Sequence, residues 1–284
     1  MKLAIITDST CDLPAAELET LEVERVPLYV SFKGETHRDW VEITPRDIIQ
    51  GVQAGADLPT TSQPSPQDFE DAYRAALAAG AESILVITIS QKLSGTYQSA
   101  TLAKESVEAP VTVFDSAAAS VGLGNMVVKA AEMRDEGADV NQIVAALEGI
   151  RETSLPYFSV ASLDFLQKGG RIGRASALLG GLLNIKPILS LEKGVIIPAG
   201  RVRGAKKALA EVVSQVKARL AETPGRPHID FLHVQDPPAA ERLREAIEAA
   251  GIEYDGGGTY EVGAVVASHV GPGTYGLYMY IIQE

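Results

Sequence analysis

The sequence contains little cysteine and little histidine. Cys11 is the only cysteine among 284 residues, which excludes an internal disulfide framework and a thiolate metal cluster. The four histidines, His37, His228, His233 and His269, form no H-E-x-x-H or similar metal-binding unit. We therefore expect no metal site in this protein.

Long hydrophobic runs are missing as well. The longest apolar stretch, residues 177–185, is about half as long as a bilayer span requires. The apolar run after Lys2 is too short for the core of a signal peptide. We expect a cytoplasmic protein without a transmembrane segment.

Positive charge is scarce, since 25 Lys and Arg residues stand against 37 Asp and Glu, for a net charge of −12. Nucleic-acid binding draws much of its affinity from neutralised phosphates, so we expect no nucleic-acid partner. The basic residues form two local groups that suit either an anionic group or plain solvation: Lys168, Arg171 and Arg174; Arg201, Arg203, Lys206 and Lys207.

The length suggests two domains, and the first half alternates strand-like with helix-like segments. The strand-like runs are residues 3–7, 23–32, 84–90 and 111–115. The helix-like segments run from 66 to about 79, from near 94 through 101–107, after 120, and over 140–150. This alternation predicts an α/β fold in which a parallel sheet carries helices on both faces, a three-layer domain at 1–155.

The second half, 156–284, is less regular. Its strand-like runs are 157–161, a pair within 186–198, 228–234, 264–270 and 277–284; its helices are 209–220 and 239–249. We interpret the glycines at 256–258 as a loop. A mixed sheet with helices on one side, a two-layer α/β domain, accounts for this pattern.

A literal G-x-G-x-x-G occurs at Gly271, Gly273 and Gly276. A dinucleotide site needs a helix after the glycines, but only eight residues, apolar and aromatic, follow Gly276. We therefore expect a tight turn between two strands, with His269 where the earlier strand enters it. The position of His269 alone leaves core packing and ligand contact equally open.

Polar side chains gather where three predicted strands end, at residues 8–10, 90–96 and 115–116, and in the loop 60–65. Each has an ordinary explanation in helix caps and turns. Ser94 and Gly95 are the most informative, because a helix N-terminus after a buried strand offers free N–H groups to an anion. The hydrolase elbow G-x-S-x-G is absent, so Ser94 has no clear signature of a nucleophile.

Seven segments in order resemble the DegV family, whose members bind fatty acids. They are I-T-D-S-T-C-D-L-P at 6–14, T-S-Q-P-S at 61–65, L-S-G-T-Y-Q-S-A at 93–100, F-D-S-A-A-A-S-V-G-L-G at 114–124, L-Q-K-G-G-R-I-G at 166–173, L-N-I-K-P-I-L at 183–189 and H-V-G-P-G at 269–273. Each segment is weak alone, but the ordered set covers almost the whole chain.

The resemblance implies one long-chain fatty acid, such as palmitate, in a tunnel between two domains, and no other cofactor. It implies that Thr61, Ser62, Ser94 and the Gly95 N–H hold the carboxylate, with His269 near the same head group. A protonated imidazole there would help to stabilise the carboxylate.

The resemblance also implies a partner. The related FakB proteins present the fatty acid to a FakA-like fatty acid kinase, which makes acyl phosphate for phospholipid synthesis. Arg171 would lie near the transfer surface, and Arg203 in the region that docks the partner. Many members have arginine–threonine–arginine where this chain has Arg203-Gly204-Ala205, so docking through that stretch lacks two polar groups.

We therefore expect a lipid-binding carrier with no catalytic residue of its own. The alternative is a stand-alone acyl or phosphoryl transferase, or a hydrolase, that uses Ser94 and Asp8. A third possibility is a lipid-bound regulatory protein without a kinase partner.

Overall fold

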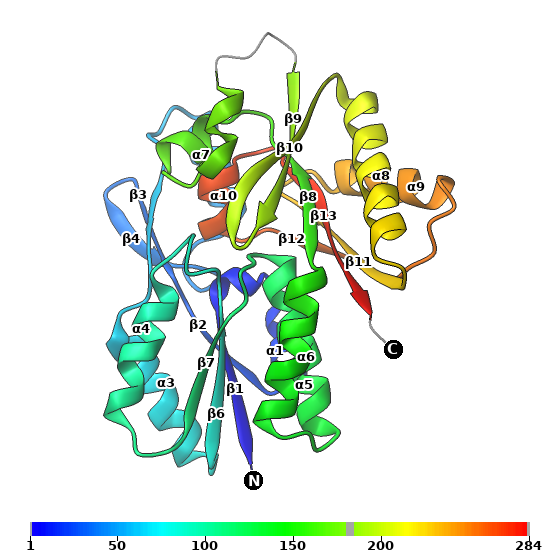
Figure 1. The fold of residues 1–284 in the computed structure, drawn as a ribbon. Coiled ribbons are helices and arrows are strands. Elements are labelled where there is room, and N and C mark those ends of the chain that lie inside the picture. The colour runs from blue at the N-terminus through cyan, green and yellow to red at the C-terminus, as the bar shows by residue number, and fades with distance from the viewer. Residues whose placement is uncertain (1, 180–184, 283–284) are drawn as a thin grey trace.

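Two large sheets organise the chain, one in each half (Figure 1). The structure is a computed structural model and describes residues 2–179 and 185–282. Part of the apolar stretch 177–185 and of the motif at 183–189 lies outside the described residues. Within the part of the chain that is described, no helix combines the length and the apolar character that crossing a membrane would need.

The first sheet is parallel, and its strand order is β2-β1-β6-β7. Its strands are β1 (Leu3–Asp8), β2 (Val23–Val26), β6 (Ser83–Thr88) and β7 (Val111–Asp115). All six residues of β6 are buried, because helices cover the sheet on both faces. On one face lie α3 (Pro66–Ala78) and α4 (Thr96–Ala103); on the other lie α1 (Ala15–Thr20), α5 (Val121–Asp135) and α6 (Val140–Thr153) (Figure 1).

The helix predicted from residue 66 is confirmed in detail. The Ser65 hydroxyl accepts from the Asp68 N–H, and the Asp68 carboxylate accepts from the Ser65 N–H, which completes a capping box. Pro66 occupies the first helical position. An N–H group there would have no acceptor within the helix, so the lack of an N–H in proline costs nothing. The helix stops before Gly80, whose φ of +90° a glycine adopts without strain.

The predicted strand at 23–32 is wrong as a single element. It divides into β2 and β3 (Tyr29–Phe32), which belong to different sheets. Pro27, between them, has no N–H for a sheet ladder, so the chain leaves the parallel sheet there. The strand β3 pairs with β4 (Glu35–Arg38) and with β5 (Thr60–Ser62) in a small antiparallel sheet.

The second large sheet has six strands in the order β10-β9-β8-β13-β11-β12 and is mixed. Its strands are β8 (Leu155–Ser159), β9 (Ile185–Glu192), β10 (Val195–Arg203), β11 (Arg226–His233), β12 (Asp255–Glu261) and β13 (Tyr275–Ile282). The helices α8 (Ala205–Glu222) and α9 (Pro237–Ala249) pack on one face around a separate apolar cluster. The α/β fold class, parallel in the first half and mixed in the second, is confirmed. The boundary at 155/156 remains a prediction.

Residues 264–270 were expected to form a strand, and this is wrong: Ala264–Val270 is the helix α10. Five of its seven residues are buried, so apolar side chains face inward on most sides and no helical period remains to be detected. The turn at Gly271 and Gly273, with φ of +77° and +70°, therefore joins a helix to β13 rather than two strands.

The expected loop at 256–258 is also wrong, because these glycines belong to β12. Hydrogen bonding to β11 uses the backbone, so the strand forms without side chains to signal it. A Cβ at Gly256 would lie 2.7 Å from Nε2 of His228, which explains why a glycine suits this position. The remaining elements are α2 (Pro45–Gln53), α7 (Asp164–Lys168) and the short 3₁₀ turns Ser9–Cys11, Lys104–Ser106 and Gly173–Leu178.

Candidate functional site

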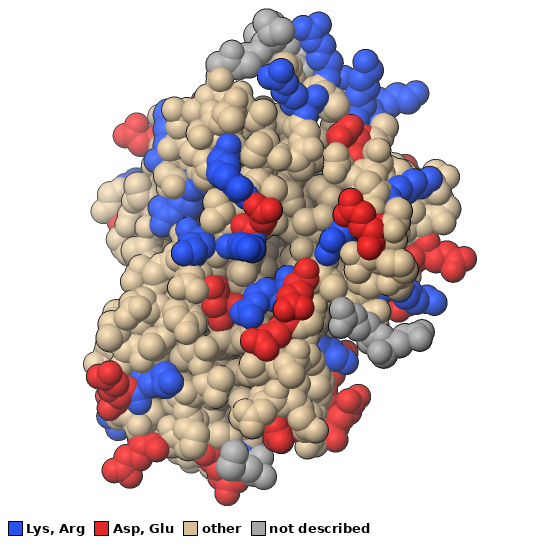
Figure 2. All heavy atoms as spheres, viewed as in Figure 1, with Lys and Arg blue, Asp and Glu red and all other residues tan. Residues whose placement is uncertain are grey.

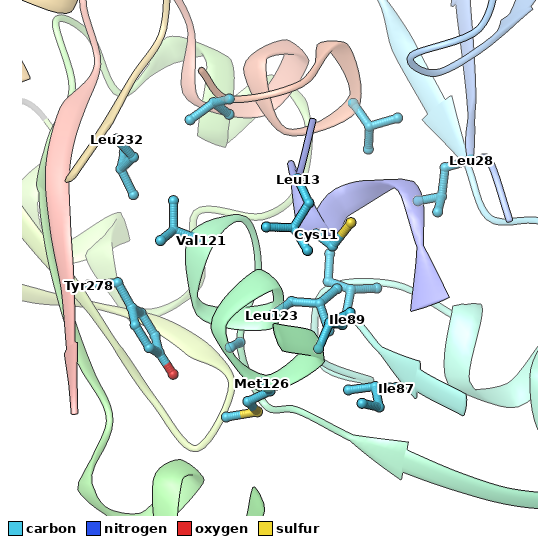
Figure 3. Packing of buried hydrophobic residues seen from close by; sticks show 14 of the residues in the cluster. Cys11, Leu13, Leu28, Ile87, Ile89, Val121, Leu123, Met126, Leu232 and Tyr278 are labelled. Carbon is cyan, nitrogen blue, oxygen red and sulfur yellow. The ribbon is translucent and has the colours of Figure 1, made fainter. Parts of the chain in front are cut away.

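A cavity of about 360 Å³ lies between the two halves of the chain. Its roof is the face of the six-stranded sheet that α8 and α9 leave uncovered, and its floor comprises α10 and loops after β6 and β7. Most of the lining is apolar: Leu28, Ile89, Leu93, Ala119, Pro156, Phe158, Leu166, Leu191, Ile196, Leu232, Val262, Val265, Val266, Val270 and Tyr278. Figure 3 shows two of these lining residues, Leu28 and Tyr278, on opposite sides of a close view of the apolar core.

Most polar side chains of the lining are concentrated in one part of it; Ser120 and Thr274 lie elsewhere, and their hydroxyls donate to Asp12 and to carbonyls of the protein. Thr61 lies on β5 and His269 in the last turn of α10, and the Thr61 Oγ1 and His269 Nε2 are 2.7 Å apart. Ser94, in the loop before α4, lines the same cavity and shares a 2.9 Å hydrogen bond with the Thr96 hydroxyl. Ser62 also lines the cavity and is exposed, which places this polar end at the mouth.

The imidazole of His269 is neutral near neutral pH. Burial, with the nearby positive charge of Arg171, lowers its pKa from 6.5 to about 4. The sequence left the protonation state of His269 open, and the low pKa shows that the protonated imidazole is not the form favoured in the ligand-free protein. Nδ1 is buried without a hydrogen-bond partner among the described residues and lies against Gly169, where a Cβ would be 2.3 Å away.

Arg171 lines the cavity and is braced by the backbone. Its Nε donates to the Leu93 carbonyl at 3.0 Å, and its Nη1 donates to the Gly169 carbonyl at 2.8 Å. These bonds leave the other terminal nitrogen without a hydrogen bond to the described residues. The result is a fixed, half-buried positive charge beside His269 and Ser94.

Two predicted residues lie outside the cavity lining. Gly95 packs against the side chain of Gln63, whose Oε1 would be 2.1 Å from a Cβ at this position. Gln63 itself lines the mouth. Arg203 is exposed at the end of β10, in the region where Figure 2 shows Lys and Arg side chains gathered over the tip of β9 and the start of α8.

Asp8 is fully buried, and its hydrogen bonds give it a structural role. Its carboxylate accepts from the N–H of Ile89 at 2.7 Å and from the N–H and hydroxyl of Thr10, which joins the ends of β1 and β6. Burial raises its pKa to about 6. Asp8 is absent from the cavity lining, and the Ser94 hydroxyl bonds to Thr96 rather than to His269 or Asp8. The described residues therefore give Ser94 no base within hydrogen-bond reach.

Sequence reasoning missed the two buried acids that hold α10. Asp12 accepts from the Gly263 N–H at 3.0 Å, and Asp39 accepts from the Val265 N–H at 3.4 Å. Burial raises the pKa of Asp12 to about 8 and that of Asp39 to about 7. Asp12 stands within the motif at 6–14, but no sequence pattern connected either acid with a helix more than 200 residues away.

Comparisons with known proteins agree on one family. A family model described as "Uncharacterised protein, DegV family" matches residues 2–281. A DegV domain-containing protein of Deinococcus radiodurans is 44% identical over 279 residues, which cover 98% of each chain. A fatty-acid-binding DegV family protein of Thermus thermophilus has a TM-score of 0.95 and 48% identity, covering 99% of this chain and 100% of its own. A stearic acid-binding protein of Eubacterium ventriosum has a TM-score of 0.90 and 30% identity, covering 99% and 98%.

Proposed function

This chain belongs to the DegV family, and we propose that it binds one long-chain fatty acid in the cavity between its halves. The acyl chain would occupy the apolar part, and the carboxylate would lie at the polar mouth beside Thr61, Ser94 and His269. The observation that carries this proposal is the asymmetry of the cavity, which is apolar over most of its length and polar at one end.

The apolar lining can supply most of the affinity. Each buried methylene contributes roughly 0.8 kcal/mol, so a chain of about 16 carbons contributes on the order of 10 kcal/mol before the cost of ordering it. A fatty acid is thus held by its tail, and a head group near the surface can stay available to another protein.

The carboxylate needs hydrogen-bond donors, because burial of an unpaired charge is costly. Arg171 supplies a fixed positive charge, and charge-assisted hydrogen bonds are stronger than neutral ones. The hydroxyl of Ser94 can turn from Thr96 to the ligand, since either hydroxyl of that pair can be the donor.

The tautomer of His269 determines whether the Thr61 hydroxyl can donate a hydrogen bond to the ligand. A proton on Nδ1 would be a buried donor without a partner, so we assign the proton to Nε2. Nε2–H then donates to the Thr61 oxygen, and the Thr61 hydroxyl is free to donate to the carboxylate. In this arrangement, neutral His269 positions Thr61 and does not act as a base.

We further infer that the bound acid is delivered to a separate enzyme. The lack of a base beside Ser94 favours a carrier over the alternative of a hydrolase or transferase that uses Ser94 and Asp8. The partner we propose is a cytoplasmic fatty acid kinase that converts the carboxylate to acyl phosphate for phospholipid synthesis. Arg171 would lie at the transfer surface. The exposed Arg203 belongs to the region expected to dock the partner.

Mass spectrometry of material extracted from the denatured, purified protein tests the binding. We expect a long-chain fatty acid at about one per chain, and much less in the double variant Thr61→Ala/Ser94→Ala. The matched control is Ser31→Ala/Thr36→Ala, which removes a hydroxyl pair, 3.0 Å apart, from the same small sheet but outside the cavity. Equal fatty acid content in both double variants would move the head-group site elsewhere.

A second experiment separates a carrier from an enzyme. The purified protein is incubated with ATP and palmitate, or with an acyl ester, in the absence of any other protein. We expect no turnover. Turnover that is lost in Ser94→Ala would favour the enzyme.

A further inference from the structure

A row of side chains forms a wall across the roof of the cavity. Tyr278 on β13 pairs with Pro156 on β8, and Leu191 on β9 pairs with Ile196 on β10. The β8–β9 register, set by Phe158 opposite Leu189, places Pro156 opposite Leu191 when continued by two residues. The four residues therefore stand side by side on four neighbouring strands, and all of them line the cavity.

A second pocket lies directly behind this row. It has a volume of about 680 Å³, and Pro156, Leu191 and Tyr278 line it as well as the cavity. The rest of its lining is largely polar and includes Gln91, Lys92, Asp115, Arg151, Lys193 and Arg219. Figure 2 shows acidic and basic side chains gathered where the two halves meet on the visible face. The wall between the apolar cavity and a polar pocket is thus one residue thick.

Tyr278 is the most firmly held member of the row. It is 2% exposed, and its hydroxyl bonds to the Ser154 hydroxyl, which lines the outer pocket. Its ring lies over Gly122 in the first turn of α5, where a Cβ would be only 2.2 Å from the ring. Because both its ring and its hydroxyl are held in place, the Tyr278 side chain should not move aside for the end of an acyl chain.

Tyr278 lies on the other side of the apolar lining from Leu28, which is close in sequence to the strand that pairs with Thr61. Figure 3 places it across the view from Leu28, and Leu28 lies one residue before β3, whose Val30 pairs with Thr61. A fatty acid whose carboxylate lies at Thr61 therefore extends its tail toward the row.

From this arrangement, and on the basis of the proposed function, we propose that Tyr278, with Pro156 and Leu191, sets the greatest acyl chain length that the protein accepts. Shorter chains end before the row. A longer chain would have to displace Tyr278 and push methylenes among the charged side chains of the outer pocket, where they would gain little apolar contact. The protein should thus select against long tails by a steric barrier rather than by an added attraction.

Replacement of Tyr278 tests the proposal. Delipidated protein is offered an equimolar mixture of palmitate and the 22-carbon docosanoate, and the bound acids are quantified by mass spectrometry. We expect wild type to retain palmitate almost alone. Tyr278→Ala joins the two spaces and should raise the ratio of docosanoate to palmitate by about tenfold or more, a difference of about 1.4 kcal/mol.

The matched control is Tyr280→Ala, which removes the same side chain from the same face of β13 but from a position that does not line the cavity. Its ratio should equal that of wild type. Leu191→Ala opens the row from β9 at a half-buried position and should raise the ratio even if Tyr278→Ala does not fold.

The outcomes separate this inference from the function on which it rests. Wild type that retains neither acid overturns fatty acid binding itself. Wild type that retains palmitate, together with folded Tyr278→Ala and Leu191→Ala variants of unchanged ratio, overturns only the length limit. Equal binding of both acids by wild type overturns it as well.

Discussion

At the mouth of the cavity, the contact between Thr61 and His269 determines which hydrogen-bond donors can face a bound carboxylate. Thr61 and His269 are 208 positions apart in the sequence, yet their Oγ1 and Nε2 atoms lie 2.7 Å apart. The low pKa of His269 means that this contact involves a neutral ring, whose only hydrogen-bond partner among the described residues is Thr61. Thr61 is therefore the residue through which His269 would influence a bound carboxylate.

Replacement of the Thr61 hydroxyl should weaken binding without harm to the fold. Thr61→Val keeps the shape of the side chain and removes the donor. A hydrogen bond to a charged group contributes about 1.5–3 kcal/mol, so we expect Kd for palmitate to rise by roughly ten- to a hundredfold in titration calorimetry. Thr36→Val on β4, at the other edge of the same small sheet, is the control. An unchanged Kd in Thr61→Val would remove Thr61 from the head-group site.

The histidine should also leave a signature in the pH dependence of stability. The pKa of His269 is about 4 in the ligand-free folded protein and near 6.5 when unfolded, so only the unfolded chain gains this proton between those values. The free energy of unfolding should therefore fall as pH decreases from about 6.5 to about 4, by roughly 2–3 kcal/mol from this residue.

Urea unfolding of the delipidated protein at several pH values measures this effect. The decrease assigned to His269 is the difference between wild type and His269→Gln. The variant His37→Gln, on β4, removes a histidine outside the cavity and serves as the control. Identical profiles for wild type and His269→Gln would contradict a buried neutral imidazole.

At the scale of elements, α10 connects the two halves. The helix follows β12 in the second half, while Asp12 and Asp39 of the first half accept hydrogen bonds from its N-cap, Gly263, and from Val265 in its first turn. Both acids are held in turn by serines: Ser120 donates to Asp12 at 2.5 Å, and Ser9 donates to Asp39 at 2.8 Å. Because α10 carries His269, these acids also set the position of the cavity mouth.

Ionisation of Asp12 should destabilise the folded protein around α10, because it places a charge in a buried site close to Asp39. Its pKa is raised to about 8 in the folded protein, so the carboxyl retains a proton that the unfolded chain loses near pH 4. The stability that it contributes is present at low pH and is lost as pH rises toward 8. We expect wild type to lose stability over that range and Asp12→Asn to lose less.

Amide hydrogen exchange locates the effect. Protection of α10 should decrease between pH 6 and 9, after correction for intrinsic rates, in wild type more than in Asp12→Asn. Asp8→Asn is the control, since Asp8 is equally buried but binds Ile89 and Thr10 instead of α10. A response of α10 to pH that is the same in wild type and Asp12→Asn would refute this role.

For the whole molecule, a ligand in the cavity would join the two halves. Leu28, Ile89 and Ala119 of the first half and Phe158 and Leu232 of the second line the same space. Their burial against one acyl chain makes separation of the halves depend on loss of the ligand.

Palmitate should accordingly raise the melting temperature. At a free concentration of 100 times Kd, binding stabilises the folded state by about 2.7 kcal/mol, which corresponds to a rise of roughly 5–10 °C for a chain of this size. Scanning calorimetry of delipidated and reloaded protein measures it. Methyl palmitate, which lacks the carboxylate, should give a smaller rise, and an equal rise would mean that the polar mouth contributes nothing.

The sequence by itself determined much of this protein. Its alternating strand and helix patterns, such as the helix-like segment that begins at residue 66, act over a few residues, so local chemistry was enough to predict the parallel first half and the mixed second half. The family motifs also drew attention to Thr61, Ser94, Arg171 and His269, which the structure brings to one cavity.

Only the tertiary structure decided the rest. Whether 264–270 became a strand or a helix depended on its burial on most sides, and β12 formed through backbone pairing to which its glycines give no local clue. The neutral state of His269 and the wall at Tyr278 depend on neighbours that are distant in sequence. A pattern along the chain records which residues can be buried together, but desolvation and close packing exist only once the chain has brought them into contact.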